Sequence, residues 1–472
     1  MVFSSLFFLF LFLPLNLIIY NLVTSLKAKN LILIIFSLIF YAWGEPIWIS
    51  LLIFSATIDY FNGKIIEKNR GNFKAKSTLA FSIFINISLL VFFKYYGFVV
   101  ESINQTLNLT LTYKEFGLPI GISFYTFQTL SYTIDVYRGK VSSQKSYLKF
   151  LMFVSLFHQL VAGPIVRYKD IAKEIEYRTV SLSRFNKGIL RFINGLGKKV
   201  IIANTAGNLA GFFLDGNIEN LSVLGSWYGI SLFAVQIYFD FSGYSDMAIG
   251  LGHMCGFTYR ENFNYPYIAK SATDFWRRWH ISLGSFFRDY VYIPLGGNKK
   301  RHILNLSIVW FLTGLWHGAS WNFVLWGLYF GFFIAAEKIF LLKLFAKIPK
   351  FFSHLYLILI VLVGWVLFYF ENLSQGLKYM GIMFGVSGAQ LYSSDIYIRF
   401  MNNIYFYILA LILSTPIIKI IIMKLKNEFN LNTNKYKPSE NILQGVYIVL
   451  ILIISSSLLV GQSYNPFLYF RF

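Results

Sequence analysis

The chain has 472 residues, of which 56% are hydrophobic, 20% aromatic and only 13% charged. Soluble domains usually contain about 25% charged residues, so this composition excludes a soluble enzyme and predicts an integral membrane protein. The net charge is +21, from 42 Lys and Arg against 21 Asp and Glu, and the cations cluster between apolar runs as they do in cytoplasmic loops. We therefore expect no nucleic acid as a partner.

The N-terminal third predicts a regular series of membrane helices. We expect them over 2–23, 31–43, 47–61, 78–100 and 118–137. The first run is long enough to cross a hydrocarbon core of about 30 Å, and we interpret it as a retained helix with its N-terminus outside. Gly44 and Pro46 interrupt the next two, which predicts a helical hairpin. The cationic loops then all fall on the cytoplasmic side.

The middle of the chain is less regular. Glycines among basic residues in 148–166 and 186–215 predict broken or interfacial helices. Residues 223–252 predict a long membrane segment with polar interruptions. Residues 268–298 carry too many charges for contact with lipid, so they should be re-entrant or face the cytoplasm.

The last third predicts simple helices again. We expect them over 303–316, 321–341, 351–370, 403–423 and 442–460. The whole chain then has 10 to 12 transmembrane helices in a single polytopic domain, 1–472. Its helical core covers about 118–345, and its C-terminal helices cover 351–472.

Polar side chains inside membrane segments are costly, so each is a functional candidate. Gln236, Asp240 and Tyr244 are spaced four residues apart and share one helix face. They could form a cavity wall that binds substrate or orients a base. The alternative is a buried network that pairs with the arginines of 277–288.

A second group combines tryptophan with arginine. Trp276, Arg277 and Arg278 could hold phosphates of a coenzyme or a lipid carrier, because guanidinium groups form bidentate hydrogen bonds and stack on rings. The alternative is an interfacial cluster that anchors the protein at the cytoplasmic face.

A third group lies at the break between two predicted helices. His317 could accept a proton from an attacking hydroxyl group, or it could be a core histidine. Asn322 follows as a candidate substrate-binding residue. The six histidines show no pair at helical spacing, and there is one cysteine, Cys255, so we expect neither a metal site nor a disulfide.

Several long motifs, in this order, resemble the membrane-bound O-acyltransferase (MBOAT) family. They are 236–250 (QIYFDFSGYSDMAIG), 264–267 (NYPY), 274–283 (DFWRRWHISL), 290–298 (YVYIPLGGN), 313–327 (TGLWHGASWNFVLWG) and 465–472 (NPFLYFRF). Within the family they resemble the branch of the alginate O-acetylation membrane subunit and its peptidoglycan-acetylating relatives.

The resemblance implies an all-α polytopic fold, with transmembrane and re-entrant helices around a central channel. It also implies acyl transfer from a cytoplasmic thioester towards an extracytoplasmic hydroxyl. The family's invariant histidine corresponds to His317, and its upstream polar partner corresponds to His280.

We therefore expect a bacterial inner-membrane acetyltransferase with both termini outside, which modifies an alginate-like exopolysaccharide or peptidoglycan. Acetyl-CoA would be the donor, with no tightly bound cofactor. The partners would be membrane lipid and an extracytoplasmic polysaccharide O-acetyltransferase. Two alternatives stay open: D-alanyl transfer to teichoic acid from an acyl carrier protein, and a transporter or channel without bond chemistry.

Overall fold

The computed structural model describes residues 1–114, 116–161, 163–216, 218–428, 438–461 and 468. This part of the chain is helical and contains no β-strand. It divides into two compact units, 1–192 with 244–261 and 193–243 with 262–472, which we call the first and second units. The expectation of one domain over 1–472 stays a prediction.

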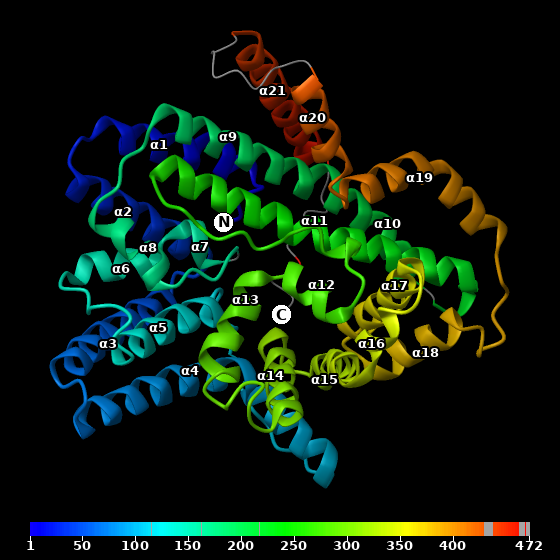
Figure 1. Cartoon of the computed structure of the whole chain (residues 1–472), viewed down its shortest axis with the longest axis horizontal. Helices are drawn as coiled ribbons and strands as arrows, with labels where there is room; N and C mark the ends of the chain where they lie inside the picture. The colour runs from blue at the N-terminus through cyan, green and yellow to red at the C-terminus, as the bar shows by residue number, and fades with distance from the viewer. Residues whose placement is uncertain (115, 162, 217, 429–437, 462–467, 469–472) are drawn as a thin grey trace. The chain divides into compact units, whose positions relative to one another are not determined.

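The first unit begins with the N-terminal helices (Figure 1). Its elements are η1 (Phe8–Phe12), α1 (Leu13–Leu22), α2 (Leu26–Gly44), α3 (Ile49–Lys68), α4 (Phe73–Leu107), α5 (Ile122–Tyr137), α6 (Tyr147–Ser155), α7 (Phe157–Leu160) and α8 (Tyr168–Glu176). The hairpin interrupted at 44–48 and the break between α6 and α7 confirm the predictions for these segments. The first helix differs, because it covers only Phe8–Leu22 and is shorter than the predicted crossing.

A buried polar network joins α3, α4 and α5, which pack against one another. Asp59 on α3 accepts hydrogen bonds from Ser82 Oγ at 2.6 Å and from Asn86 Nδ2 at 2.7 Å. Thr129 on α5 donates to Asn86 Oδ1 at 3.2 Å. Lipid tails are as apolar as leucine, so polar contacts of this kind help to specify how membrane helices associate.

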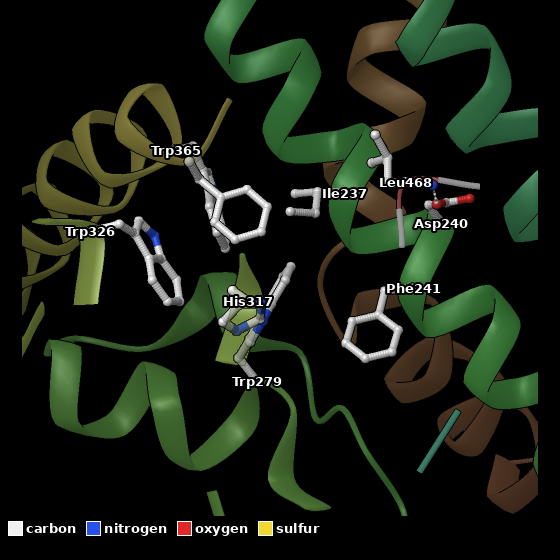
Figure 2. Close-up of a pocket in the computed structure, with 9 residues that line it drawn as sticks. Ile237, Asp240, Phe241, Trp279, His317, Trp326, Trp365 and Leu468 are labelled. Atoms are coloured by element: carbon white, nitrogen blue, oxygen red, sulfur yellow. Dashed lines mark hydrogen bonds between the residues drawn. The ribbon is translucent and has the colours of Figure 1, made fainter. Parts of the chain in front are cut away.

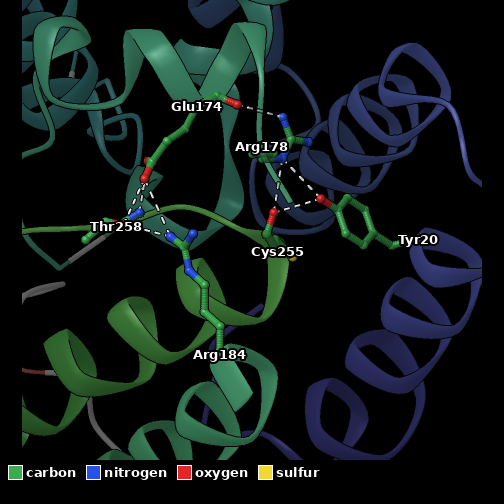
Figure 3. A network of polar contacts seen from close by, with 6 residues as sticks. All are labelled: Tyr20, Glu174, Arg178, Arg184, Cys255 and Thr258. Atoms are coloured by element: carbon green, nitrogen blue, oxygen red, sulfur yellow. Dashed lines mark hydrogen bonds and ion pairs between the residues drawn. The ribbon is translucent and has the colours of Figure 1, made fainter. Parts of the chain in front are cut away.

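A second network holds the end of α11 (Val223–Cys255), a helix that contributes to both units (Figure 3). Arg178 Nε donates to the carbonyl of Cys255 at 3.0 Å and to the Tyr20 hydroxyl at 3.1 Å. The Tyr20 hydroxyl donates to the same carbonyl at 2.7 Å. Cys255 is buried beside this cation, where it terminates a helix.

The second unit contains the end of α9 (Leu182–Gly197), the start of α11 and most of the other helices. They are η2 (Lys198–Ala203), α10 (Asn204–Leu214), η3 (Ile218–Asn220), η4 (Pro266–Ile268), α12 (Ala272–Arg278), α13 (Ile281–Phe287), η5 (Arg288–Tyr292), α14 (His302–His317), α15 (Trp321–Ala336), η6 (Glu337–Leu341), α16 (Leu342–Phe345), α17 (Lys350–Tyr369), α18 (Leu373–Met383), α19 (Ser394–Leu413), α20 (Ile417–Glu428) and α21 (Pro438–Gly461). The short elements between 266 and 292 confirm the irregular segment predicted there.

Of the two alternatives predicted for 186–215, broken helices are wrong, whereas interfacial helices stay a prediction. The helix α9 (Leu182–Gly197) continues without a break through the π-helical η2 into α10. Glycine disfavours a helix in water but is tolerated in membrane helices, where it permits close packing. A Cβ atom at Gly243 of α11 would lie 2.7 Å from the carbonyl oxygen of Gly195. The close packing of α9 on α11 at this point therefore needs glycine at position 243.

The single helix predicted over 403–423 is also wrong, because the chain divides it into α19 and α20. Pro416 lies at the division. Proline has no backbone N–H and disfavours helical torsion angles in the residue before it, so a helix usually ends at this point.

Seven helices in the described part of the chain are long and apolar enough to cross a membrane. They are Leu26–Gly44, Ile49–Lys68, Phe73–Leu107, Trp321–Phe345, Lys350–Tyr369, Ser394–Leu413 and Ile442–Gly461. The other expected crossings correspond to helices that are shorter or more polar, such as α5, α11 and α14. The protein is a polytopic, all-α membrane protein.

Candidate functional site

A pocket lies within the second unit (Figure 2). Its lining residues come from α11, α14, α15, α17, the segment between α12 and α13, and the C-terminal Leu468; they are Ile237, Asp240, Phe241, Trp279, His317, Trp326, Trp365, Phe368 and Leu468. One imidazole and one carboxylate therefore share a lining that is otherwise apolar and aromatic.

His317 is the last residue of α14, and a close crossing of two helices sets its position. A Cβ atom at Gly327 of α15 would lie 2.3 Å from the carbonyl oxygen of Trp310, and one at Gly314 would lie 2.4 Å from that of Phe323. Such distances are below any normal contact, so α14 and α15 can approach this closely only because both residues are glycine. The crossing brings His317 beside Trp326.

Aromatic rings surround the imidazole of His317, which is only 6% exposed. The ring of Trp326 meets it edge-to-face with centroids 4.8 Å apart, and the ring of Phe368 lies at 5.4 Å. A site enclosed by rings contains little water, and electrostatic interactions are stronger there than in solution.

The other polar part of the pocket is a buried ion pair. Asp240 Oδ1 lies 2.6 Å from Lys199 Nζ, and the two side chains are 4% and 2% exposed. Asp240 Oδ2 also accepts a hydrogen bond from the backbone N–H of Leu468 at 3.0 Å. Sequence reasoning missed Lys199, although a lysine within an apolar helix is itself a signal that a carboxylate partner exists.

The face of Gln236, Asp240 and Tyr244 does not act as one wall. Gln236 is buried on α11 outside the pocket lining. Tyr244 belongs to the first unit, where its ring stacks on Phe3 with centroids 4.4 Å apart. The alternative of pairing between this face and the arginines of 277–288 is wrong for Asp240, whose cation is Lys199.

The helix α12 carries the tryptophan–arginine group. Trp276 packs edge-to-face on Trp310, Trp326 and Phe330 at 5.0 to 5.4 Å, outside the pocket lining. Arg277 is exposed, and Arg278 Nε lies 3.0 Å from Asp274 Oδ1. The three residues therefore do not form one contact surface.

The buried carboxylate of Glu337 fixes the start of α12. Its Oε1 and Oε2 accept the backbone N–H groups of Ala272 at 2.5 Å and Thr273 at 2.8 Å. Ser271 Oγ accepts the third, from Asp274, at 3.0 Å. The first three backbone N–H groups of the helix therefore all have acceptors. This fixes the start of α12, which is followed directly by Trp279 of the pocket lining.

His280 lies just outside the pocket, in the connection between α12 and α13. Its backbone has φ of +46°, an uncommon conformation for a residue other than glycine. Its Nδ1 lies 3.2 Å from Asn262 Oδ1, and its ring meets Phe241 edge-to-face at 4.6 Å. Burial lowers the pKa of His280 to about 3, so the ring is neutral. It supports Phe241, which lines the pocket.

Asn322 joins two helices and does not line the pocket. Its Nδ2 donates to the carbonyl of Leu367 at 3.2 Å, and its Oδ1 accepts a hydrogen bond from Ser320 Oγ. This arrangement ties α15 to α17 next to Phe368. Of the residues singled out in the sequence, the pocket thus gathers His317 and Asp240.

Metal ligands do not gather in the described part of the chain, where no group of three or more His, Cys, Asp or Glu could hold an ion. Most of the C-terminal motif 465–472 lies outside the described residues, with Leu468 as the exception.

Comparison with known proteins identifies the family of this chain. The family model described as MBOAT, membrane-bound O-acyltransferase family, matches residues 136–378. The chain is 37% identical to the probable alginate O-acetylase AlgI of Pseudomonas putida, over 100% of both chains. It is 31% identical to the peptidoglycan O-acetyltransferase of Helicobacter pylori, over 100% of this chain and 98% of the relative. The teichoic acid D-alanyltransferase of Bacillus subtilis is 30% identical over 44% of this chain and 56% of its own.

Proposed function

This chain belongs to the membrane-bound O-acyltransferase family and is an O-acyltransferase, and we propose that it moves an acetyl group from a cytoplasmic thioester to an extracytoplasmic polysaccharide hydroxyl. The observation that carries the proposal is the position of His317. It lies in an aromatic pocket, and the resemblance of the sequence motifs to the family implies that it is the family's invariant histidine.

The chemistry follows from a thioester that is already activated. The hydroxyl oxygen attacks the carbonyl carbon while His317 accepts the hydroxyl proton. The tetrahedral intermediate then expels the thiolate, and the thiolate accepts the proton that His317 took from the hydroxyl. The products are an ester and a free thiol, and holding both reactants in one pocket supplies much of the rate.

The donor is acetyl-CoA in this proposal, and Arg277 and Arg278 bind its phosphates. The guanidinium of Arg277 is exposed and that of Arg278 is half-buried, so both can reach a ligand. Charge-assisted hydrogen bonds to phosphate are among the strongest that a protein makes. Asp240 contacts the substrate in the pocket, while Trp276, His280 and Asn322 support its walls.

The acceptor class follows from the two full-length relatives, whose names specify alginate and peptidoglycan. We therefore place the protein in a bacterial inner membrane, where it hands acetyl groups to a secreted polysaccharide O-acetyltransferase. The relative named for D-alanyl transfer matches less than half of this chain, so D-alanylation from a carrier protein is the second candidate.

Sealed inverted membrane vesicles test the proposal, because their outer surface is the cytoplasmic one. Vesicles that contain the protein together with its secreted partner transferase are loaded with unacetylated alginate or with peptidoglycan fragments and supplied outside with radiolabelled acetyl-CoA. We expect labelled acetyl ester inside the vesicles and loss of this label in His317→Ala, which should insert at the same level.

Label transfer by the His317→Ala variant at the wild-type rate would contradict the role of His317 as the base. Transfer of D-alanine from a D-alanyl carrier protein, with no transfer from acetyl-CoA, would establish the second candidate instead.

A further inference from the structure

We propose that the indole N–H of Trp326 stabilises the oxyanion that forms on the thioester carbonyl during acyl transfer. This assignment rests on the proposed function and adds a catalytic residue to it. Trp326 is fully buried on α15 and lines the pocket with His317 (Figure 2).

The Nε1 atom of Trp326 is buried and donates to no acceptor in the described part of the chain. Buried N–H groups are nearly always paired, because leaving one unpaired costs free energy. Because Trp326 also lines the pocket beside the candidate base, the substrate is the acceptor that this assignment gives to its N–H.

Two other neutral N–H groups of the pocket are already in use. Trp365 Nε1 donates to the Tyr267 hydroxyl at 3.2 Å. The backbone N–H of Leu468 donates to Asp240 at 3.0 Å. Trp276 Nε1 is also buried without an acceptor among the described residues, but Trp276 does not line the pocket. Trp326 combines an open donor with a place in the lining.

The geometry relative to His317 suits the reaction. The two rings meet at 79° with centroids 4.8 Å apart, so the imidazole and the indole can contact the same substrate. The crossing of α14 and α15 at Gly314 and Gly327 sets this relation, and both side chains project from rigid helices.

The hydroxyl oxygen forms a bond to the carbonyl carbon, the C=O π electrons move to the carbonyl oxygen, and the hydroxyl proton moves to His317. The negative charge on that oxygen accepts a hydrogen bond from Trp326 Nε1. When the C=O bond reforms, the C–S bond breaks and the thiolate takes the proton from His317. Donors fixed in this way act most strongly in a site of low polarity.

The first test compares Trp326→Phe with Trp310→Phe, which makes the same truncation in the same aromatic cluster outside the pocket lining. We expect Trp326→Phe to lower kcat by ~10²- to 10³-fold, the usual effect of removing one oxyanion donor, with KM for acetyl-CoA within about twofold of wild type. Trp310→Phe should change kcat far less. Equal losses in both variants would show that packing, not the N–H, is responsible.

A second variant separates the N–H from the ring. Replacing Trp326 by 3-benzothienylalanine keeps the bicyclic shape and substitutes sulfur for N–H. We expect the same loss of kcat with an unchanged thermal unfolding midpoint, and wild-type activity would overturn the assignment. Wild type and His317→Ala run in parallel: an inactive wild type with acetyl-CoA would contradict the proposed function, whereas an active wild type with an unaffected isostere would contradict only the role of Trp326.

Discussion

At the scale of single residues, the buried ion pair of Lys199 and Asp240 carries a large desolvation cost. Each ion loses its hydration on burial, and their mutual attraction offsets this cost only when the geometry is good and the remaining lone pairs are satisfied. The 2.6 Å contact and the hydrogen bond from Leu468 meet both conditions. Removing one partner should therefore cost more than removing both.

Lys199→Met tests this expectation. It leaves the Asp240 carboxylate buried without its cation, so we expect a loss of about 3–5 kcal/mol in the free energy of unfolding. Lys199→Met/Asp240→Asn should recover much of that stability. Thermal unfolding in detergent measures both variants.

Lys378→Met is the matched control, because it breaks an ion pair with Glu219 in which both partners are exposed. It should change stability little. A single mutant Lys199→Met as stable as wild type would show that the pair does not hold α11 against η2.

At the scale of elements, the crossing of α14 and α15 decides where the base lies. Gly314 and Gly327 bring the two backbones together, and the carboxylate of Glu337 holds α12 beside them. The pocket is thus assembled from helix ends and crossings, which are the parts of a helical protein most sensitive to small displacements.

Gly327→Ala probes this crossing directly. The added Cβ atom would lie 2.3 Å from the carbonyl oxygen of Trp310, a backbone atom that cannot move alone. The helices must separate, so we expect kcat to fall by at least ~10-fold, since displacements of about 1 Å can cost up to ~10²-fold. The vesicle assay and the unfolding midpoint report the two effects.

Gly381→Ala in α18 is the control, since a Cβ atom there has no neighbour within 4 Å. Alanine favours a helix over glycine by about 0.5–1 kcal/mol, so this variant should be as stable as wild type or more so. Full activity in Gly327→Ala would mean that the crossing does not position His317.

At the scale of the whole molecule, the cationic loops predict the orientation in the membrane. Lys and Arg stay in the cytoplasm because they resist translocation. Reporter tags inserted after Lys76 and after Lys300 should therefore both be cytoplasmic, and one at Phe472 should be outside. Phe472 lies outside the described residues.

Cysteine accessibility in intact cells measures the three positions. Opposite sides for the tags at Lys76 and Lys300 would require an odd number of crossings between them and would contradict the predicted orientation. A tag at Glu101 should report the outside and serves as the control for labelling.

Much of this protein could be read from its sequence, because in a membrane the solvent imposes simple rules. A span needs about 20 apolar residues, and its backbone must be hydrogen-bonded internally. These rules yielded the all-α class, the hairpin at Gly44 and the irregular stretch before α14. His317 could be singled out as a candidate from its sequence motif, which can be recognised without knowing any contact between helices.

Only the tertiary structure decided which polar residues meet. Asp240 and Tyr244 share a helix face in the sequence, yet one lies in the pocket and the other stacks on Phe3 in the first unit. Lys199 and Asp240 are 41 positions apart, and Trp326 reaches His317 across a crossing of two helices. Periodicity describes one helix at a time, whereas an ion pair, a glycine crossing and an open N–H exist only after helices have packed, because each depends on distances between segments that the sequence does not specify.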